Sequence, residues 1–118
     1  MEPYTVVVSW TAQLECSLST PAYQIARDAL CLSVWRAGGS ALACWVTPTL
    51  ARMVIQIPAG CDADQFITWV RAAASFALIC AVGTSPCWAD AYTYTRIPCI
   101  MVATEIAACL IMDDDTLA

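Results

Sequence analysis

The amino-acid sequence predicts a single α+β domain spanning residues 1–118. Segments rich in β-branched and aromatic residues alternate with longer segments whose apolar residues recur at helical spacing. A chain of 118 residues can bury a core without disulfides. The predicted elements are separated by Gly38–Gly39, Pro48, Pro58 and Pro98.

The first predicted strand covers Tyr4–Gln13, where Thr, Val and Trp dominate. A helix should follow from Thr20 to Ala37, because Thr can cap the free N–H groups and Pro21 suits the first turn. Gly38–Gly39 would end it, since glycine tolerates a left-handed conformation. The stripe expected to face the core comprises Ala22, Ile25, Ala29, Leu32 and Trp35.

Two central strands are predicted over residues 41–47 and Leu50–Ile57, with Pro48 and Thr49 at the break. Leu50 and Arg52 are two residues apart, so on a strand they point to the same face. A metal-binding His-x-His pair has this spacing. Leucine has no donor atom and arginine has no lone pair to offer, so neither residue can hold a metal.

A second helix should begin after Asp62, with Gln65 as its capping-box partner, and end near Val82. Apolar residues cover most of its circumference, so it is either deeply buried or shared with a partner. Its expected inward stripe is Phe66, Val70, Ala73, Ala77 and Cys80, with Trp69, Ala72 and Phe76 beside it.

A fourth strand is predicted over Trp88–Ile97, followed by a third helix over Ile100–Met112. The inward residues of this helix are predicted to be Ile100, Ala103, Ala107 and either Leu110 or Ile111. The order β-α-β-β-α-β-α predicts a ferredoxin-like fold, a four-stranded antiparallel sheet with two helices on one face and an added C-terminal helix.

The composition is more apolar than is usual for a soluble monomer. Hydrophobic residues make up 60 %, charged residues 13 %, and the net charge is −5, against about 45–50 % and about 25 % in typical domains. The chain therefore either hides apolar surface in a homo-oligomer or is marginally soluble. The apolar run Ala72–Val82 is shorter than the roughly 20 residues of a membrane span, and the start has no basic signal segment. We expect a cytoplasmic protein.

The chain contains no Lys, His or Asn, and its five arginines are its only cationic side chains. Without histidine it lacks the commonest general base and transition-metal ligand. An acidic balance also argues against strong binding to nucleic acid, which depends on neutralising phosphates.

No two of the eight cysteines form a C-x-x-C pair, so neither the zinc nor the redox spacing is present. Most are expected to be buried free thiols acting as small hydrophobes. Disulfides in a secreted factor, or thiolates that meet at a metal, remain open alternatives. The eight are Cys16, Cys31, Cys44, Cys61, Cys80, Cys87, Cys99 and Cys109.

The chain resembles the REP-associated tyrosine transposases, relatives of the single-tyrosine HUH insertion-sequence transposases. Their second and third strands carry Met-Pro-(Asn/Asp)-His-x-His and an apolar run, where this chain has Thr47-Pro-Thr-Leu-Ala-Arg-Met-Val-Ile55. Their first helix often opens Leu-Thr-Pro and continues to Asp-Ala-Leu, matched by Ser19–Pro21 and Asp28–Leu30.

Further matches lie in the second half of the chain. The family has a Trp followed by Lys on the second helix, a Gly-x-Ser loop and a Trp-x-x-x-Tyr segment. This chain has Trp69-Val70, Gly83-Thr-Ser85 and Trp88-Ala-Asp-Ala-Tyr92. The resemblance extends over about residues 4 to 115.

The resemblance implies a divalent metal held by the two histidines and a tyrosine on the last helix that attacks the DNA phosphate. Leu50 and Arg52 occupy the histidine positions here, Cys109 or Leu110 the tyrosine position, and Val70 the lysine position. We therefore expect a transposase-like domain with no intact catalytic residues and no bound metal or other cofactor.

Hairpin or single-stranded DNA, bound weakly, is the expected partner, and no membrane is expected. Each candidate contact also has a structural interpretation: Arg52 paired with Asp90 or Glu105, the tryptophans and Tyr92 packed, and Cys109 an inert thiol. The alternative hypothesis is a non-enzymatic structural or designed domain that self-associates. The candidate DNA contacts are Arg52, Arg71, Arg96, Trp69, Trp88 and Tyr92.

Overall fold

A computed structural model of the chain describes residues 2–13, 20–47, 50–82, 87–88, 91–98 and 100–108. A helix over residues 100–108, here called the 100–108 helix, is the last described element. The elements before it are β1 (Tyr4–Gln13), α1 (Thr20–Arg36), β2 (Ser40–Val46), β3 (Leu50–Ile57), α2 (Ala63–Val82), β4 (Cys87–Trp88) and β5 (Thr93–Ile97).

The strands form one antiparallel sheet in the order β2-β3-β1, with β4 and β5 both paired to the remaining edge of β1. The two middle strands are therefore β1 and β3, and β2 lies at one edge. This order is that of a ferredoxin-like sheet, and it confirms the fold class predicted from the element order.

The fourth strand was predicted as one continuous element over Trp88–Ile97, and this prediction is wrong. Trp88 pairs with Ala12 and Thr93 pairs with Ser9 of β1. Trp88 and Thr93 are five positions apart, but their partners on β1 are only three positions apart. Two additional residues cannot be accommodated in a regular antiparallel ladder, so pairing is interrupted between β4 and β5.

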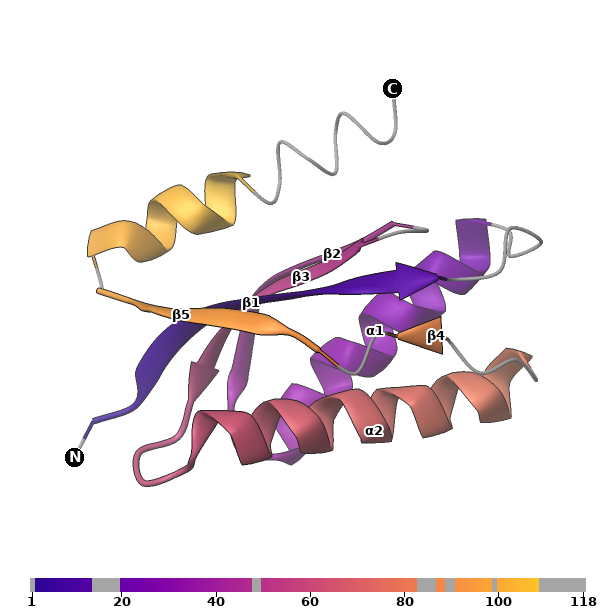
Figure 1. Cartoon of the computed structure of the whole chain (residues 1–118), viewed down its shortest axis with the longest axis horizontal. Coiled ribbons are helices and arrows are strands. Elements are labelled where there is room, and N and C mark those ends of the chain that lie inside the picture. Colours follow the sequence, from indigo (N-terminus) through magenta and orange to yellow (C-terminus); the bar gives the residue numbers. More distant parts are fainter. Residues whose placement is uncertain are drawn as a thin grey trace.

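The molecule has three layers, because helices cover both faces of the sheet (Figure 1). The helices α1 and α2 lie on one face, and the 100–108 helix lies on the other. Along β1, Val6, Val8 and Trp10 alternate toward α1 and α2 and are buried. On β3 the corresponding residues are Ala51, Met53, Ile55 and Ile57.

The buried face of α1 differs from the predicted one. Leu32 and Trp35 were expected to point inward, but they are 52 % and 68 % exposed. The helix instead turns its smaller side chains to the core, and the Ser33 hydroxyl donates to the Ala29 carbonyl at 2.7 Å. Small residues let the backbones approach closely, which a search for large apolar residues overlooks. The buried residues of α1 are Ala26, Ala29, Leu30, Ser33 and Val34.

In α2 the apolar residues divide between a buried and an exposed face. The buried residues are Ala63, Phe66, Ile67, Val70, Ala74 and Leu78. The prediction was correct for Phe66 and Val70 but wrong for Ala77 and Cys80, which are exposed. The helix is thus not buried all round, and part of its apolar surface faces outward.

The 100–108 helix also presents a face other than the predicted one. Ile100 is 82 % exposed, and Ala103 and Ala107 are exposed as well. Val102, Glu105 and Ile106 are partly buried instead. Their spacing of three and four residues makes one helical stripe. A charged residue lies in this stripe, so a prediction from apolar residues alone chose the wrong face.

The predicted ends of α1 and the predicted start of α2 are confirmed, whereas the predicted end of the third helix at Met112, with Leu110 and Ile111, lies outside the described residues. Gly38 has a φ of +90°, and the N–H of Gly39 donates to the Val34 carbonyl at 3.0 Å. At the start of α2, the Gln65 N–H donates to Asp62 Oδ2 at 3.1 Å. In the described part of the chain, no helix has the length and apolar character required to cross a membrane.

Candidate functional site

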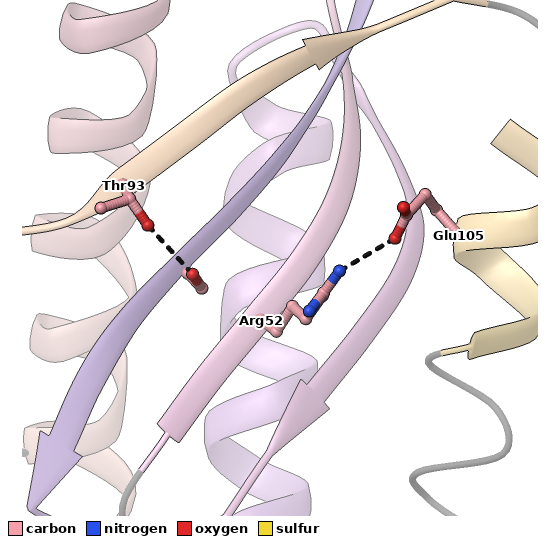
Figure 2. A network of polar contacts seen from close by, with 4 residues as sticks. Arg52, Thr93 and Glu105 are labelled. Atoms are coloured by element: carbon pink, nitrogen blue, oxygen red, sulfur yellow. Dashed lines mark hydrogen bonds and ion pairs between the residues drawn. The ribbon is translucent and has the colours of Figure 1, made fainter. Parts of the chain in front are cut away.

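The candidate site lies on the sheet face that the 100–108 helix covers (Figure 2). The strand register places Trp45, Arg52, Ser9 and Thr93 side by side across β2, β3, β1 and β5. Ser9 Oγ and Thr93 Oγ1 are hydrogen-bonded at 3.2 Å. Arg52, Ser9 and Thr93 therefore form a polar row across three neighbouring strands. Arg52 is the residue at the second position of the His-x-His spacing.

Arg52 projects from β3 toward the 100–108 helix and pairs there with Glu105 (Figure 2). Its Nη2 donates to Glu105 Oε2 at 2.9 Å. The two side chains are 29 % and 22 % exposed, so the ion pair is partly shielded from water. The Arg52 Nε is buried and has no hydrogen-bond partner among the described residues. Of the two partners proposed from sequence, Glu105 is confirmed, and Asp90 lies outside the described residues.

Leu50 opens β3 on the same face as Arg52, as the two-residue spacing predicts. Its N–H donates to Thr47 Oγ1 at 3.0 Å, and its carbonyl accepts the Thr47 N–H at 2.8 Å. These bonds fix the turn between β2 and β3. Val54, two residues beyond Arg52 on this face, is fully buried. The site is thus a covered patch of the sheet and not an open groove.

A second polar cluster lies on the opposite face, between α2 and the edge of the sheet. Tyr92 donates its hydroxyl to Asp64 Oδ1 at 2.6 Å, and Tyr94 donates to Asp64 Oδ2 at 3.4 Å. The two rings stack with centroids 6.3 Å apart. Burial and then the Asp64 hydrogen bond raise the pKa of Tyr92. The negative charge of Asp64 is the largest cause of the raised pKa of Tyr94.

Arg71 and Arg96 both stack on aromatic rings on this side of the sheet. The Arg71 guanidinium lies 5.2 Å from the Trp10 ring centroid and 5.3 Å from that of Tyr92. The Arg96 guanidinium lies 4.6 Å above the ring of Tyr4. Tyr4 also donates its hydroxyl to the Cys61 carbonyl at 2.6 Å, and burial raises its pKa.

Arg96 and Tyr94 line a cavity of about 620 Å³ beside the N-terminus of α2. Acidic residues share this cavity, among them Glu2 and Asp62. Their negative charge opposes the binding of phosphate there, although the aromatic rings and the guanidinium suit a base.

The six candidate DNA contacts do not form one surface. Arg71 and Tyr92 touch each other, whereas Arg52 lies on the other face of the sheet. Trp69 was expected to pack in the core, but it is 47 % exposed on the outer side of α2. The side chain of Trp88 and the whole of Cys109, the position that corresponds to the family's tyrosine, lie outside the described residues.

Among the four cysteines whose side chains are described, burial is mixed. Cys44 is buried and Cys31 partly buried, but Cys61 and Cys80 are exposed; all four are free thiols. Among the described residues, no group of three or more His, Cys, Asp or Glu side chains could hold a metal ion.

Sequence reasoning did not identify the role of Asp64, which joins α2 to Tyr92 and Tyr94. The only hint in the sequence is that Asp64 lies in the first turn of α2. An acidic residue is favourable there whatever it contacts, so its position does not predict the link to the tyrosines. Its link to the tyrosines joins residues 28 and 30 positions away in the chain. Only the packing of α2 against the sheet edge brings them together.

The same three-layer arrangement occurs in solved transposase structures. A candidate transposase from Deinococcus radiodurans R1 superposes with a TM-score of 0.70 over 92 % of this chain and 88 % of its own, at 12 % identity. A REP-associated tyrosine transposase bound to a REP hairpin also gives 0.70, over 98 % of this chain and 70 % of its own, at 16 % identity. No family model and no curated protein sequence matches the chain.

These similarities define the class of the fold: this chain has the transposase fold that the sequence motifs suggested. The sequence motifs resemble those of the REP-associated tyrosine transposases, and one of the two solved structures that share the fold is a protein of that group. At 12 % and 16 % identity the similarity establishes the fold, and the chemistry has to be argued from the residues of this chain.

Proposed function

We propose that this chain is a transposase-like domain that binds hairpin or single-stranded DNA weakly and does not cleave it. The observation that carries the proposal is the position of Arg52. It occupies the second histidine position of the family signature, and it contacts the 100–108 helix through Glu105. In the family the nucleophile is carried by the last helix, so the contact between β3 and the 100–108 helix supports a site at this place whose chemistry differs.

The residues present do not fit a divalent metal. Leu50 has no donor atom, and Arg52 brings a positive charge with no lone pair. Glu105 offers one carboxylate, but its Oε2 accepts the Arg52 guanidinium. A cation would need several oxygen or nitrogen ligands and would be repelled by the guanidinium. We therefore derive no metal-dependent step for this chain.

The nucleophile of the family has no equivalent at the matching position. Cys109 follows Glu105 by four residues, a spacing that puts both on one face of the helix predicted over Ile100–Met112. The chain contains no His or Lys that could lower the pKa of a thiol and so activate it as a nucleophile. Val70, at the family's lysine position, is buried in the core.

A cleavage assay tests the absence of activity. A labelled REP-type hairpin oligonucleotide is incubated with the full chain and Mg²⁺ or Mn²⁺, then run on a denaturing gel. We expect neither a shortened strand nor a protein–DNA adduct. A covalent adduct that forms with the wild-type chain would overturn the proposal that the site is inactive.

Binding itself is tested by fluorescence anisotropy with hairpin, single-stranded and duplex oligonucleotides. Arg96 is exposed at the sheet edge, next to the partly exposed ring of Tyr94. Arg96→Gln should weaken binding and make it less dependent on salt, because it removes the positive charge that offsets the acidic residues of the cavity. Arg36→Gln, at the end of α1, is the matched control and should leave both unchanged. Equal effects of the two variants would exclude the sheet edge as the contact.

A second candidate function, a self-associating domain without a nucleic-acid role, is favoured by the outer face of α2. Trp69, Phe76 and Ile79 are 47 %, 70 % and 42 % exposed, and with Ala72 they recur at intervals of three and four residues. Such a stripe can pair with a second copy. No binding to any oligonucleotide at low salt, together with concentration-dependent association, would favour this function over the first.

A further inference from the structure

Two thiols meet between α1 and β2, away from both polar clusters. Cys44 pairs with Met53 in the sheet, so its side chain points toward the helices, and only 4 % of it is exposed. Cys31 follows the buried Leu30 on α1 and packs against the same core. The two side chains are hydrogen-bonded to each other.

The pair is asymmetric in its access to solvent. Cys31 is partly exposed, whereas Cys44 is buried. A reagent from solution therefore reaches Cys31 first. The hydrogen bond from Cys44 is the main cause that lowers the pKa of Cys31 to about 7, and Arg27 adds to it, against the opposing effects of burial and Asp28. A thiol with these properties is partly ionised at neutral pH, and the thiolate is the attacking species.

We propose that Cys31 and Cys44 form a reversible disulfide by exchange with a small-molecule disulfide. The Cys31 thiolate attacks one sulfur of glutathione disulfide and releases a glutathione thiolate, which leaves a mixed disulfide on Cys31. Cys44 loses its proton, attacks Cys31 Sγ and releases the second glutathione thiolate. Two protein thiols are oxidised and one glutathione disulfide is reduced to two thiols.

The bond would join α1 to β2 within one layer of the core. The disulfide would bring the two sulfur atoms to about 2.05 Å, which is closer than a hydrogen-bond contact between thiols. The disulfide would close the short connection that runs from α1 through Gly38 and Gly39 into β2. It restricts the unfolded chain and should raise the denaturation midpoint of the oxidised form. This inference does not depend on the DNA-binding proposal.

Peptide mass spectrometry gives a direct test, because trypsin separates the two cysteines. Cleavage after Arg27, Arg36 and Arg52 yields the peptides 28–36 and 37–52, each with one cysteine. The reduced full chain is equilibrated in glutathione buffers of increasing oxidised fraction, trapped with iodoacetamide and digested. We expect a cross-linked 28–36/37–52 peptide that disappears on reduction.

Serine variants distinguish this bond from general oxidation. Cys44→Ser should stop at the glutathione adduct of Cys31, and Cys31→Ser should leave the buried Cys44 unmodified in the native chain. Cys61→Ser/Cys80→Ser, which removes the two thiols that are exposed among the described residues, should retain the cross-link. The proposal is overturned if Cys61 and Cys80 acquire glutathione while no 28–36/37–52 peptide forms.

The rate of alkylation provides a readout that does not need the disulfide. With limiting iodoacetamide, Cys31 modification should rise with pH around a midpoint near 7, whereas in Cys44→Ala, which removes the hydrogen-bond donor, the midpoint should be higher. An unchanged midpoint in Cys44→Ala would show that the two thiols do not interact. Far-UV circular dichroism of each variant verifies that it is folded.

Discussion

At Arg52 and Glu105, two side chains 53 positions apart in the sequence hold the 100–108 helix on the sheet. Each is less than one-third exposed, so each has lost part of its hydration. The loss of one partner leaves the other charge partly desolvated and uncompensated, which costs more than the pair gains. An arginine at this position therefore has two effects, because it offers no lone pair to a metal and it adds a tertiary contact.

The first prediction concerns this ion pair. Arg52→Met and Glu105→Gln should each lower the free energy of unfolding by about 1–2 kcal/mol, between the values for exposed and buried pairs. The double variant should be less destabilised than the sum, with a coupling energy of about 0.5–3 kcal/mol. Urea denaturation of the four proteins measures the cycle. Strict additivity would show that the pair does not form in solution.

At the scale of an element, β5 is held at the sheet edge by its pairing with β1 and by contacts to α2. Asp64 accepts hydrogen bonds from Tyr92 and Tyr94, and both phenols have raised pKa values in the folded chain. The folded state therefore keeps protons that the unfolded state releases near pH 10. The stabilisation is complete below that pH and is lost as the pH rises above it.

The second prediction concerns the pH dependence of stability in the alkaline range. The stability of the wild-type chain should fall as the pH increases above 10.0, the ordinary pKa of a tyrosine phenol. The stability of Tyr92→Phe should fall less steeply over the same range. Near neutral pH, Tyr92→Phe should cost about 1 kcal/mol for the lost hydrogen bond. Urea unfolding on either side of pH 10 measures both effects. A steeper alkaline loss in Tyr92→Phe than in the wild type would contradict the assigned contact.

In the whole molecule, packing of the three layers buries only part of the apolar side chains. The sheet and its two covering layers bury one face of each helix, but α2 leaves Trp69, Phe76 and Ile79 in contact with water. A chain with 60 % apolar residues has too few polar ones to cover such a surface. Association of two copies through this face would bury it.

The third prediction tests that association. Phe76→Asp should raise the dissociation constant of the self-associated form about tenfold or more, since burial of a Phe side chain is worth about 1.5–3 kcal/mol. Ile100→Gln replaces an equally prominent residue on the opposite layer and should have no such effect. Sedimentation equilibrium over a range of concentrations distinguishes them. Identical behaviour of the two variants would place the interface elsewhere.

The sequence by itself determined most of the elements and their order, although it did not reveal the division of the last strand into β4 and β5. β-branched runs located β1 and β3, Asp62 and the two glycines located helix ends, and the element order led to the sheet topology. These features are local, because strand propensity, capping and turn chemistry act over a few residues. The sequence also showed that Leu50 and Arg52 share a face and cannot bind a metal together.

Only the tertiary structure decided which face of each helix is buried and which distant side chains meet. In α1, small residues such as Ala26 and Ser33 are inward while Trp35 is exposed, because close packing against the sheet depends on shape more than on apolar size. The contacts of Arg52 with Glu105, Asp64 with Tyr92 and Cys31 with Cys44 each join two separate elements. Such contacts form only after the layers have packed, so no pattern within one segment specifies them.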